Sequence, residues 1–237
     1  MRSRWLAGLI LLLGLPQVAA QEPTFMEAAT HPGSGQLYGR FVWISRPFRG
    51  TEPVSQLDLK SAYGITRRLA LLPFMGVDED GVTDASLRLK FRILQHDTGP
   101  IDTWRVSLQG GGEWFDGRQA SARAGIVSTT IRGRHGINAQ ADWHDADRRE
   151  RRFQLNASHL YRIAPAQYAA TTMGAWYTMV ESLNVLDRSG DNESDVAVGI
   201  LYEARRWAAE ASLRFMDPAE AISRRQTRLG VGLRALL

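Results

Sequence analysis

The chain has 237 residues, with 29 Lys and Arg against 25 Asp and Glu, and it contains no cysteine. The absence of cysteine excludes disulfides, thiolate metal sites and lipid attachment through a cysteine. The small excess of basic residues is spread along the chain, so the composition does not indicate nucleic-acid binding.

The N-terminus has the pattern of a secretory signal peptide. Arg2 and Arg4 precede an uncharged apolar stretch over residues 5–15, and small residues lead up to Gln21. That stretch is too short for a spanning helix, which needs roughly 20 residues. We therefore expect residues 1–20 to be a signal peptide that is cleaved after Ala20, and residues 21–35 to be an unpaired periplasmic lead-in.

From residue 36 onward, apolar and polar residues alternate repeatedly. The clearest stretch, residues 85–93, has apolar residues at every odd position and Ser86, Arg88, Lys90 and Arg92 between them. Such alternation predicts a strand, because successive side chains of a strand point to opposite faces. Similar patterns, some of them weaker, predict further strands over residues 36–45, 56–65, 69–77, 104–109, 119–130, 137–144, 152–158, 168–180, 195–203, 207–215 and 228–234.

About twelve such strands predict an all-β fold, a transmembrane antiparallel up-and-down β-barrel over residues 36–237. A soluble sandwich or a lipocalin-like barrel would also alternate. Aromatic residues near the strand ends favour the membrane barrel, since aromatic girdles mark the membrane interfaces; they are Trp43, Trp104, Trp143, Tyr161, Trp207 and Phe215. Long links at residues 46–55, 181–194 and 217–224 are expected at the external end, and tight links at 64–68, 163–166 and 204–206 at the periplasmic end.

One stretch also resembles a known family. Residues 63–69 read Tyr-Gly-Ile-Thr-Arg-Arg-Leu, and residues 71–74, 82–84 and 87–92 continue the pattern. They resemble the bacterial family named "MetA-pathway of phenol degradation" over roughly residues 55–115, although this chain has Arg67 where that family usually has Asp and Phe74 where it has Tyr. The resemblance implies an outer-membrane barrel for uptake or export of small, often aromatic, compounds. It implies no catalytic residues.

Basic residues dominate the polar faces of the predicted strands. A charge at mid-depth on the lipid side would cost about 2–4 kcal/mol, so these faces must line the lumen. The predicted lumen-lining residues are Arg40, Lys60, Arg88, Lys90, Arg92, Arg105, Arg123, Arg152, Arg214, Arg228 and Arg234, with the acidic Asp58, Asp142, Glu203 and Glu210. We expect a passive channel or binding barrel for small anionic or aromatic solutes. The alternative is a plugged lumen in which Arg residues pair with carboxylates, which would make the barrel structural or adhesive.

No pattern in the chain indicates catalysis. An outer-membrane phospholipase places a His and a Ser on one strand face, whereas Ser158 and His159 are adjacent and so face opposite ways. The histidines show no metal-ligand spacing, and the acidic segment 187–193 lacks the spacing of an EF-hand. We expect no enzyme activity, no cofactor and no metal, and a monomer in the bacterial outer membrane, in contact with lipid, lipopolysaccharide and a small solute.

Overall fold

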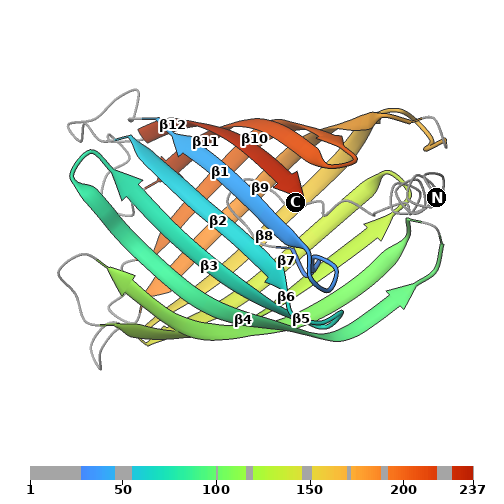
Figure 1. Ribbon diagram of the computed structural model, residues 1–237. Coiled ribbons are helices and arrows are strands. Elements are labelled where there is room, and N and C mark those ends of the chain that lie inside the picture. The colour runs from blue at the N-terminus through green and yellow to red at the C-terminus, as the bar shows by residue number, and fades with distance from the viewer. Residues whose placement is uncertain are drawn as a thin grey trace, which may run out of the picture.

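The computed structural model describes residues 28–45, 55–99, 101–115, 120–145, 151–169, 172–187, 192–217 and 226–236. Its strands are β1 (Leu37–Ile44), β2 (Gln56–Gly64), β3 (Leu69–Asp78), β4 (Gly81–Asp97), β5 (Thr103–Phe115), β6 (Ser121–Arg132), β7 (His135–Asp145), β8 (Arg151–Ala164), β9 (Gly174–Asp187), β10 (Glu193–Ala204), β11 (Trp207–Asp217) and β12 (Gln226–Leu236). Each strand pairs with its neighbours in the chain, and β1 also pairs antiparallel with β12 (Figure 1). The prediction of an up-and-down barrel of about twelve strands is therefore confirmed.

No helix in the described ranges is long and apolar enough to cross a membrane.

The outer surface of the barrel is apolar on every strand. On β4, Leu87, Leu89 and Phe91 are 46–48% exposed, while Arg88 and Lys90 between them are 5% and 2% exposed. All twelve strands contribute large exposed apolar side chains in this way. Exposing so large an apolar surface to water is unfavourable, whereas contact between this surface and lipid tails is favourable. This is therefore the surface of a membrane-spanning barrel.

The barrel has two distinct ends. We call the end where β1 begins and β12 ends the termini end, and the opposite one the loop end. Outward-facing Trp104, Trp176 and Trp207 lie near the termini end, and the equivalent tryptophans near the loop end are Trp43, Trp114 and Trp143. These two belts are placed as interfacial girdles are in membrane barrels.

The expected alternation of long and short links is only partly present. The link between Ile44 and Gln56 is long and lies at the loop end as predicted. However, β9 continues to Asp187, so most of the predicted long link over residues 181–194 is strand. At the termini end, the predicted tight link at 163–166 is wrong because β9 does not begin until Gly174.

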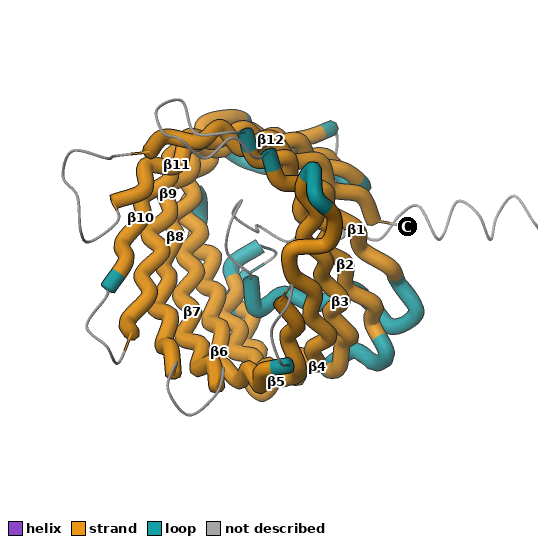
Figure 2. Tube along the Cα trace, turned by 90° about the vertical axis from the view of Figure 1, so that its left-hand side faces the viewer, coloured by secondary structure: helices purple, strands orange, loops and turns teal. Residues whose placement is uncertain are grey.

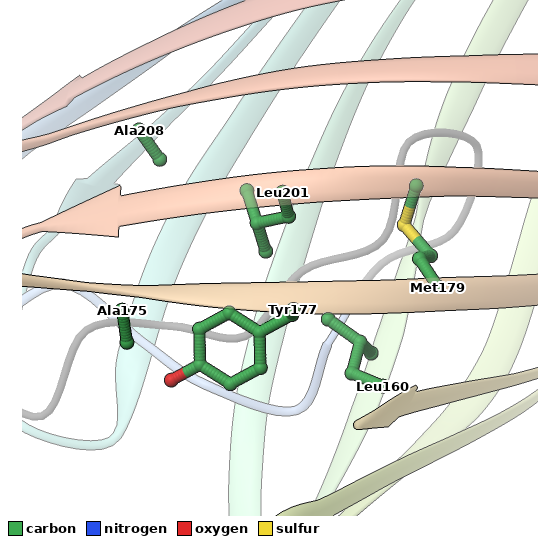
Figure 3. Close-up of a cluster of buried hydrophobic side chains, with 6 residues drawn as sticks. All are labelled: Leu160, Ala175, Tyr177, Met179, Leu201 and Ala208. Carbon is green, nitrogen blue, oxygen red and sulfur yellow. The ribbon is translucent and has the colours of Figure 1, made fainter. Parts of the chain in front are cut away.

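Strand limits were misjudged where alternation weakens. On β4 the pairing with β5 shifts register between Arg92 and Leu94, and the strand continues four residues beyond Ile93, to Asp97. On β9 the inward face is itself largely apolar. Ala175, Tyr177 and Met179 pack with Leu160 of β8, Leu201 of β10 and Ala208 of β11 in a buried cluster (Figure 3). With apolar residues on both faces, a period of two gives little signal.

Candidate solute path

Residues preceding β1 lie inside the barrel. We call residues 28–36 the strap; its Ala28 and Ala29 are 0% exposed and Thr30 is 4% exposed. Figure 2 looks into the barrel and shows loop segments, in teal, inside the ring of strands. Residues 21–35 were predicted only as an unpaired periplasmic lead-in, and no sequence pattern indicated that residues 28–33 would lie inside the barrel. Residues 1–27, including the predicted cleavage after Ala20, lie outside the described ranges.

Side chains of the barrel wall hold the strap by its backbone. The amide of Ala29 donates to Thr129 Oγ1 (2.7 Å), and its carbonyl accepts from Ser107 Oγ (3.1 Å). Lys90 Nζ donates to the carbonyl of Ala28 (3.0 Å). Thr129 itself donates to Asn138 Oδ1 (2.6 Å), so the attachment continues across β6 and β7. The strap is thus bonded to three neighbouring strands of the barrel wall, β4, β5 and β6, and at these contacts it does not add a strand to the sheet.

The strap then turns into β1 against the end of β2. The amide of Gly35 donates to the carbonyl of Gly64 (2.7 Å), and the amide of Gly64 donates to the carbonyl of Gln36 (3.0 Å). A Cβ atom on Gly64 would lie 2.1 Å from the carbonyl oxygen of Gly33. Glycine is therefore required at this position for the strap to pass so close to β2.

His31 is the ionisable group of the strap that faces the wall. Its Nδ1 lies 3.2 Å from the carbonyl oxygen of Ala29, and its Nε2 lies 3.2 Å from that of Lys90. Burial, followed by the positive charge of Lys90, lowers the pKa of His31 from 6.5 to about 4. At neutral pH the ring is therefore uncharged and donates to only one of the two carbonyls.

A cavity of about 340 Å³ lies beside the strap at the termini end, and we call it the cationic chamber. Nine basic residues and one acidic residue line it. The basic residues are Arg40, Lys60, Arg88, Lys90, Arg92, Arg105, Arg205, Arg206 and Arg234, and the acidic one is Glu203. Sequence reasoning had placed all of these in the lumen except Arg205 and Arg206, which it missed because they lie in the turn between β10 and β11, where alternation gives no assignment.

Three cations of this chamber stand out because no carboxylate touches them. Among the described residues, no carboxylate lies within ion-pair distance of Lys90, Arg92 or Arg105. Their hydrogen bonds go to neutral oxygens instead: Lys90 to Ala28, Arg92 to the carbonyl of Arg67, and Arg105 Nε to Thr103 Oγ1 at 3.2 Å. Asp97 of β4 attracts Arg92 and Arg105 only from beyond that distance. An anion in the chamber would therefore not have to displace a carboxylate from these three cations.

Apolar side chains line the chamber beside its cations. Leu72 and Ala62 are buried together with Tyr38 packed against them, and Phe74 also lines the cavity. Leu72 is directly paired with Arg88, and Lys60 Nζ lies 5.7 Å from the centroid of the Phe74 ring. The chamber therefore offers cations and apolar side chains next to one another.

A second cavity, of about 310 Å³, opens at the loop end, and we call it the vestibule. Here two of the lining arginines, Arg123 and Arg214, are paired with carboxylates. Arg123 contacts Glu113 (2.8 Å) and Asp142 (2.6 Å), and Glu113 also contacts His144 Nδ1 (2.9 Å). Arg214 Nε donates to Asp195 Oδ2 (2.9 Å). The vestibule thus contains a connected network of ion pairs, whereas Lys90, Arg92 and Arg105 of the chamber form none with described residues.

Lys60, Phe74 and Arg88 line both cavities. The two spaces therefore adjoin each other at these three side chains, which lie on the neighbouring strands β2, β3 and β4. A solute that passed from one cavity to the other would pass these side chains.

The remaining predicted lumen residues have varied positions. Asp58 lines the vestibule, and Asp142 is buried beside it. Glu210 is buried against Arg40, which donates to its Oε1 through Nε (2.8 Å) and a terminal nitrogen (2.6 Å). Arg152, which is exposed, and Arg228, which is half-buried, line neither cavity.

Sequence reasoning missed several acidic residues of the lumen. Glu113 lies on β5 beyond the glycines at 110–112, where the predicted strand stopped. Glu181 lies one residue past the predicted end of the β9 strand, and Asp195 was assigned no face. Extending the period of two from Gln109 through Gly111 would have placed Glu113 inward.

The structure separates the two residues that a lipase site would need together. Ser158 is buried and accepts a hydrogen bond from Asn138 Nδ2 (3.1 Å), while the neighbouring His159 is exposed on the outer face. Within the described ranges, no group of three or more His, Asp or Glu residues is placed to hold a metal ion.

Comparison with solved structures places the fold among porins. The NanC porin superimposes with a TM-score of 0.55 at 13% identity, covering 84% of this chain and 98% of that one. The KdgM porin gives a TM-score of 0.52 at 9% identity with the same coverage, and its complex with disordered oligogalacturonate also gives 0.52, at 8% identity. At such low identity the likeness concerns the fold alone. This chain shares the β-barrel fold of these porins.

No protein-family model and no curated protein matches the sequence. The resemblance of residues 55–115 to the "MetA-pathway of phenol degradation" family therefore stays a prediction.

Proposed function

We propose that this barrel is a passive channel of the bacterial outer membrane for small anionic solutes. The observation that carries the proposal is the cationic chamber, where nine basic residues and one carboxylate surround a single cavity. Charges that line a narrow, water-filled path raise the local concentration of ions of the opposite sign. Among the described residues no carboxylate forms an ion pair with Lys90, Arg92 or Arg105, which supports the assignment because an anion would not have to displace one.

The apolar residues of the chamber extend the proposal to the kind of anion. Leu72, Phe74 and Tyr38 face a space that Arg88 and Lys90 also line. A solute with a carboxylate or similar group and a ring or short apolar chain would contact both kinds of side chain. Binding sites for small molecules commonly combine apolar walls with a few placed charges.

The chain is further proposed to act as a monomer without catalytic activity. The apolar outer face on all twelve strands supports contact with lipid and lipopolysaccharide around the whole circumference. The position of Ser158 and His159 on opposite faces supports the absence of a lipase site.

A second candidate is a non-transporting barrel that stabilises the membrane. The strap inside the lumen and the ion pairs of the vestibule favour it, because both fill space that a solute would need. The two candidates differ in whether ions cross the barrel.

Recording from refolded protein in planar bilayers under a KCl gradient separates these candidates. We expect conductance with a reversal potential of the sign for chloride selectivity. The double variant Arg92→Gln/Arg105→Gln is expected to lose much of that selectivity, while Arg152→Gln, whose site lines neither cavity, is expected to keep it. An absence of conductance would favour the structural barrel, and cation selectivity would overturn the anion channel.

A further inference from the structure

The strap occupies lumen space without being part of the barrel wall. Ala28 and Ala29 are buried, and the backbone bonds that the described strap makes with a strand lie at its end, where Gly35 and Gln36 pair with Gly64 of β2. Residues 28–33 are held instead by two hydrogen bonds with Lys90 of β4, through Ala28 and His31, and by one each with Ser107 of β5 and Thr129 of β6. A segment held by a few side-chain bonds opens more readily than a strand held by a full ladder.

One of these attachments involves the same residue that an entering anion would seek. Lys90 is 2% exposed, lines the cationic chamber and donates from Nζ to the neutral carbonyl of Ala28. The bond to Ala28 joins an ammonium to a neutral oxygen, whereas a bond to an anion adds the attraction between opposite charges. An anion that reaches Lys90 therefore competes with the strap for its Nζ.

The surroundings of Lys90 strengthen this competition. Arg92 and Arg105 line the same cavity, and neither has an ion-pair partner in the described part of the chain. They would draw an anion toward Lys90 without contributing any bond that holds the strap in place. The strap itself offers only backbone oxygens and His31 to this cluster.

We propose that the strap is a displaceable gate at the termini end, and that Lys90 couples its release to the binding of an anion in the chamber. The gating role rests on the proposed channel function; the competition for Lys90 does not. The lumen then has two alternative states: in one the strap is bonded to Lys90, and in the other an anion occupies the chamber. A ligand that binds only one of two states shifts the protein toward that state.

Because the natural sequence has no cysteine, a single introduced thiol reports on the strap. In Ala29→Cys the thiol replaces a side chain that is 0% exposed, so maleimide labelling of refolded barrels in detergent measures release. We expect inorganic phosphate, at constant ionic strength and pH, to raise the labelling rate several-fold. Adding Lys90→Met is expected to raise the rate about tenfold without phosphate and to abolish the response to it.

The matched control is Arg105→Met, which removes a positive charge from the same cavity but no bond to the strap. We expect its basal labelling rate to stay within about twofold of the parent. Equal labelling of Lys90→Met and Arg105→Met, or a rate that phosphate does not change, would overturn the proposal. This result is independent of whether the barrel conducts.

Conductance is tested separately with Ala29→Cys/Thr129→Cys, since the backbone amide of the first residue bonds the side chain of the second. Oxidation, verified by a shift on a gel, is expected to lower conductance severalfold, and reduction to restore it. Unchanged conductance with the crosslink formed would show that the strap is no gate. A barrel that conducts in neither state, yet still responds to phosphate in the labelling assay, would refute the channel and the gating role and leave the competition for Lys90 intact.

Discussion

The cationic chamber and the vestibule are similar in size, about 340 and 310 Å³, and basic side chains line both. They differ in what those side chains touch. In the vestibule Arg123 contacts two carboxylates, whereas in the chamber Lys90, Arg92 and Arg105 have none in the described part of the chain. The comparison teaches that the number of arginines in a lumen says little about its function until the partners of each are known.

The strand register explains the difference. Across the β4 ladder, Lys90 lies opposite Ala70 on β3 and Gln109 on β5, and Arg92 lies opposite Ser107. None of these directly paired residues carries a carboxylate. Near the loop end, Glu113, Arg123 and His144 succeed one another across β5, β6 and β7, and Arg123 is directly paired with His144. The register of β5, β6 and β7 thus brings side chains of opposite charge together in the vestibule.

Removing one cation from each cavity should have unequal effects on stability. Arg123→Met leaves Glu113 and the fully buried Asp142 without their guanidinium, and loss of one partner from a buried ion pair costs about 3–5 kcal/mol. Arg105→Met removes a charge with no such partner and should change stability by less than about 1 kcal/mol. Urea unfolding of refolded protein in detergent measures both. Equal losses would contradict the assignment of carboxylate partners to Arg123 and not to Arg105.

The contact between the strap and β2 can be broken from the wall side. Gly64→Ala places a Cβ atom 2.1 Å from the carbonyl oxygen of Gly33, and overpacking of this kind costs about 1–3 kcal/mol. We expect faster labelling of a thiol at residue 29, because the strap must move away. Gly39→Ala is the control, since its Cβ atom would meet nothing within 4 Å. If both variants label at the parent rate, the strap is not held against β2.

Acidification should release the strap through His31. The pKa of this ring is about 4 when docked and 6.5 ordinarily, so between these values the released state binds more protons. Release should therefore rise as pH falls from about 6.5 to 4, by at most about tenfold per unit, and should not change with pH above that range. The charges that line the same chamber are basic apart from Glu203, so they oppose protonation of the docked ring.

Labelling rates of the residue 29 thiol, divided at each pH by those of an unstructured cysteine peptide, measure this effect. In His31→Gln the dependence over this range is expected to disappear. A rate that falls on acidification would mean that the protonated ring binds the lumen better than the neutral one.

The fold was predictable because a membrane barrel imposes its pattern on almost every strand. Apolar residues at 87, 89 and 91 with Arg88 and Lys90 between them admit one arrangement, with charges inward and apolar residues toward lipid. Assigning the basic residues to the lumen followed from the same cost of charge in lipid. β9 escaped accurate prediction because Tyr177 and Met179 make its inner face apolar as well.

The division of the lumen into two regions was not predictable. Alternation assigns a face to Arg123 and to Arg105 alike, but it says nothing about the residues across the barrel or in the neighbouring strand. The ion pair of Arg123 with Asp142 depends on register between β6 and β7, which the turn at Gly133 sets. The strap was missed for another reason: its contacts are made by backbone groups of small residues, which leave no pattern in a sequence.

The central claim is that the chamber is an anion site and the vestibule a structural network of ion pairs. A crystal structure of the barrel soaked in bromide, with anomalous diffraction recorded at the bromine edge, tests it most directly. We predict bromide within hydrogen-bond distance of Lys90, Arg92 or Arg105, and none between Arg123 and its two carboxylates. Bromide bound at Arg123, with the chamber empty, would contradict the claim.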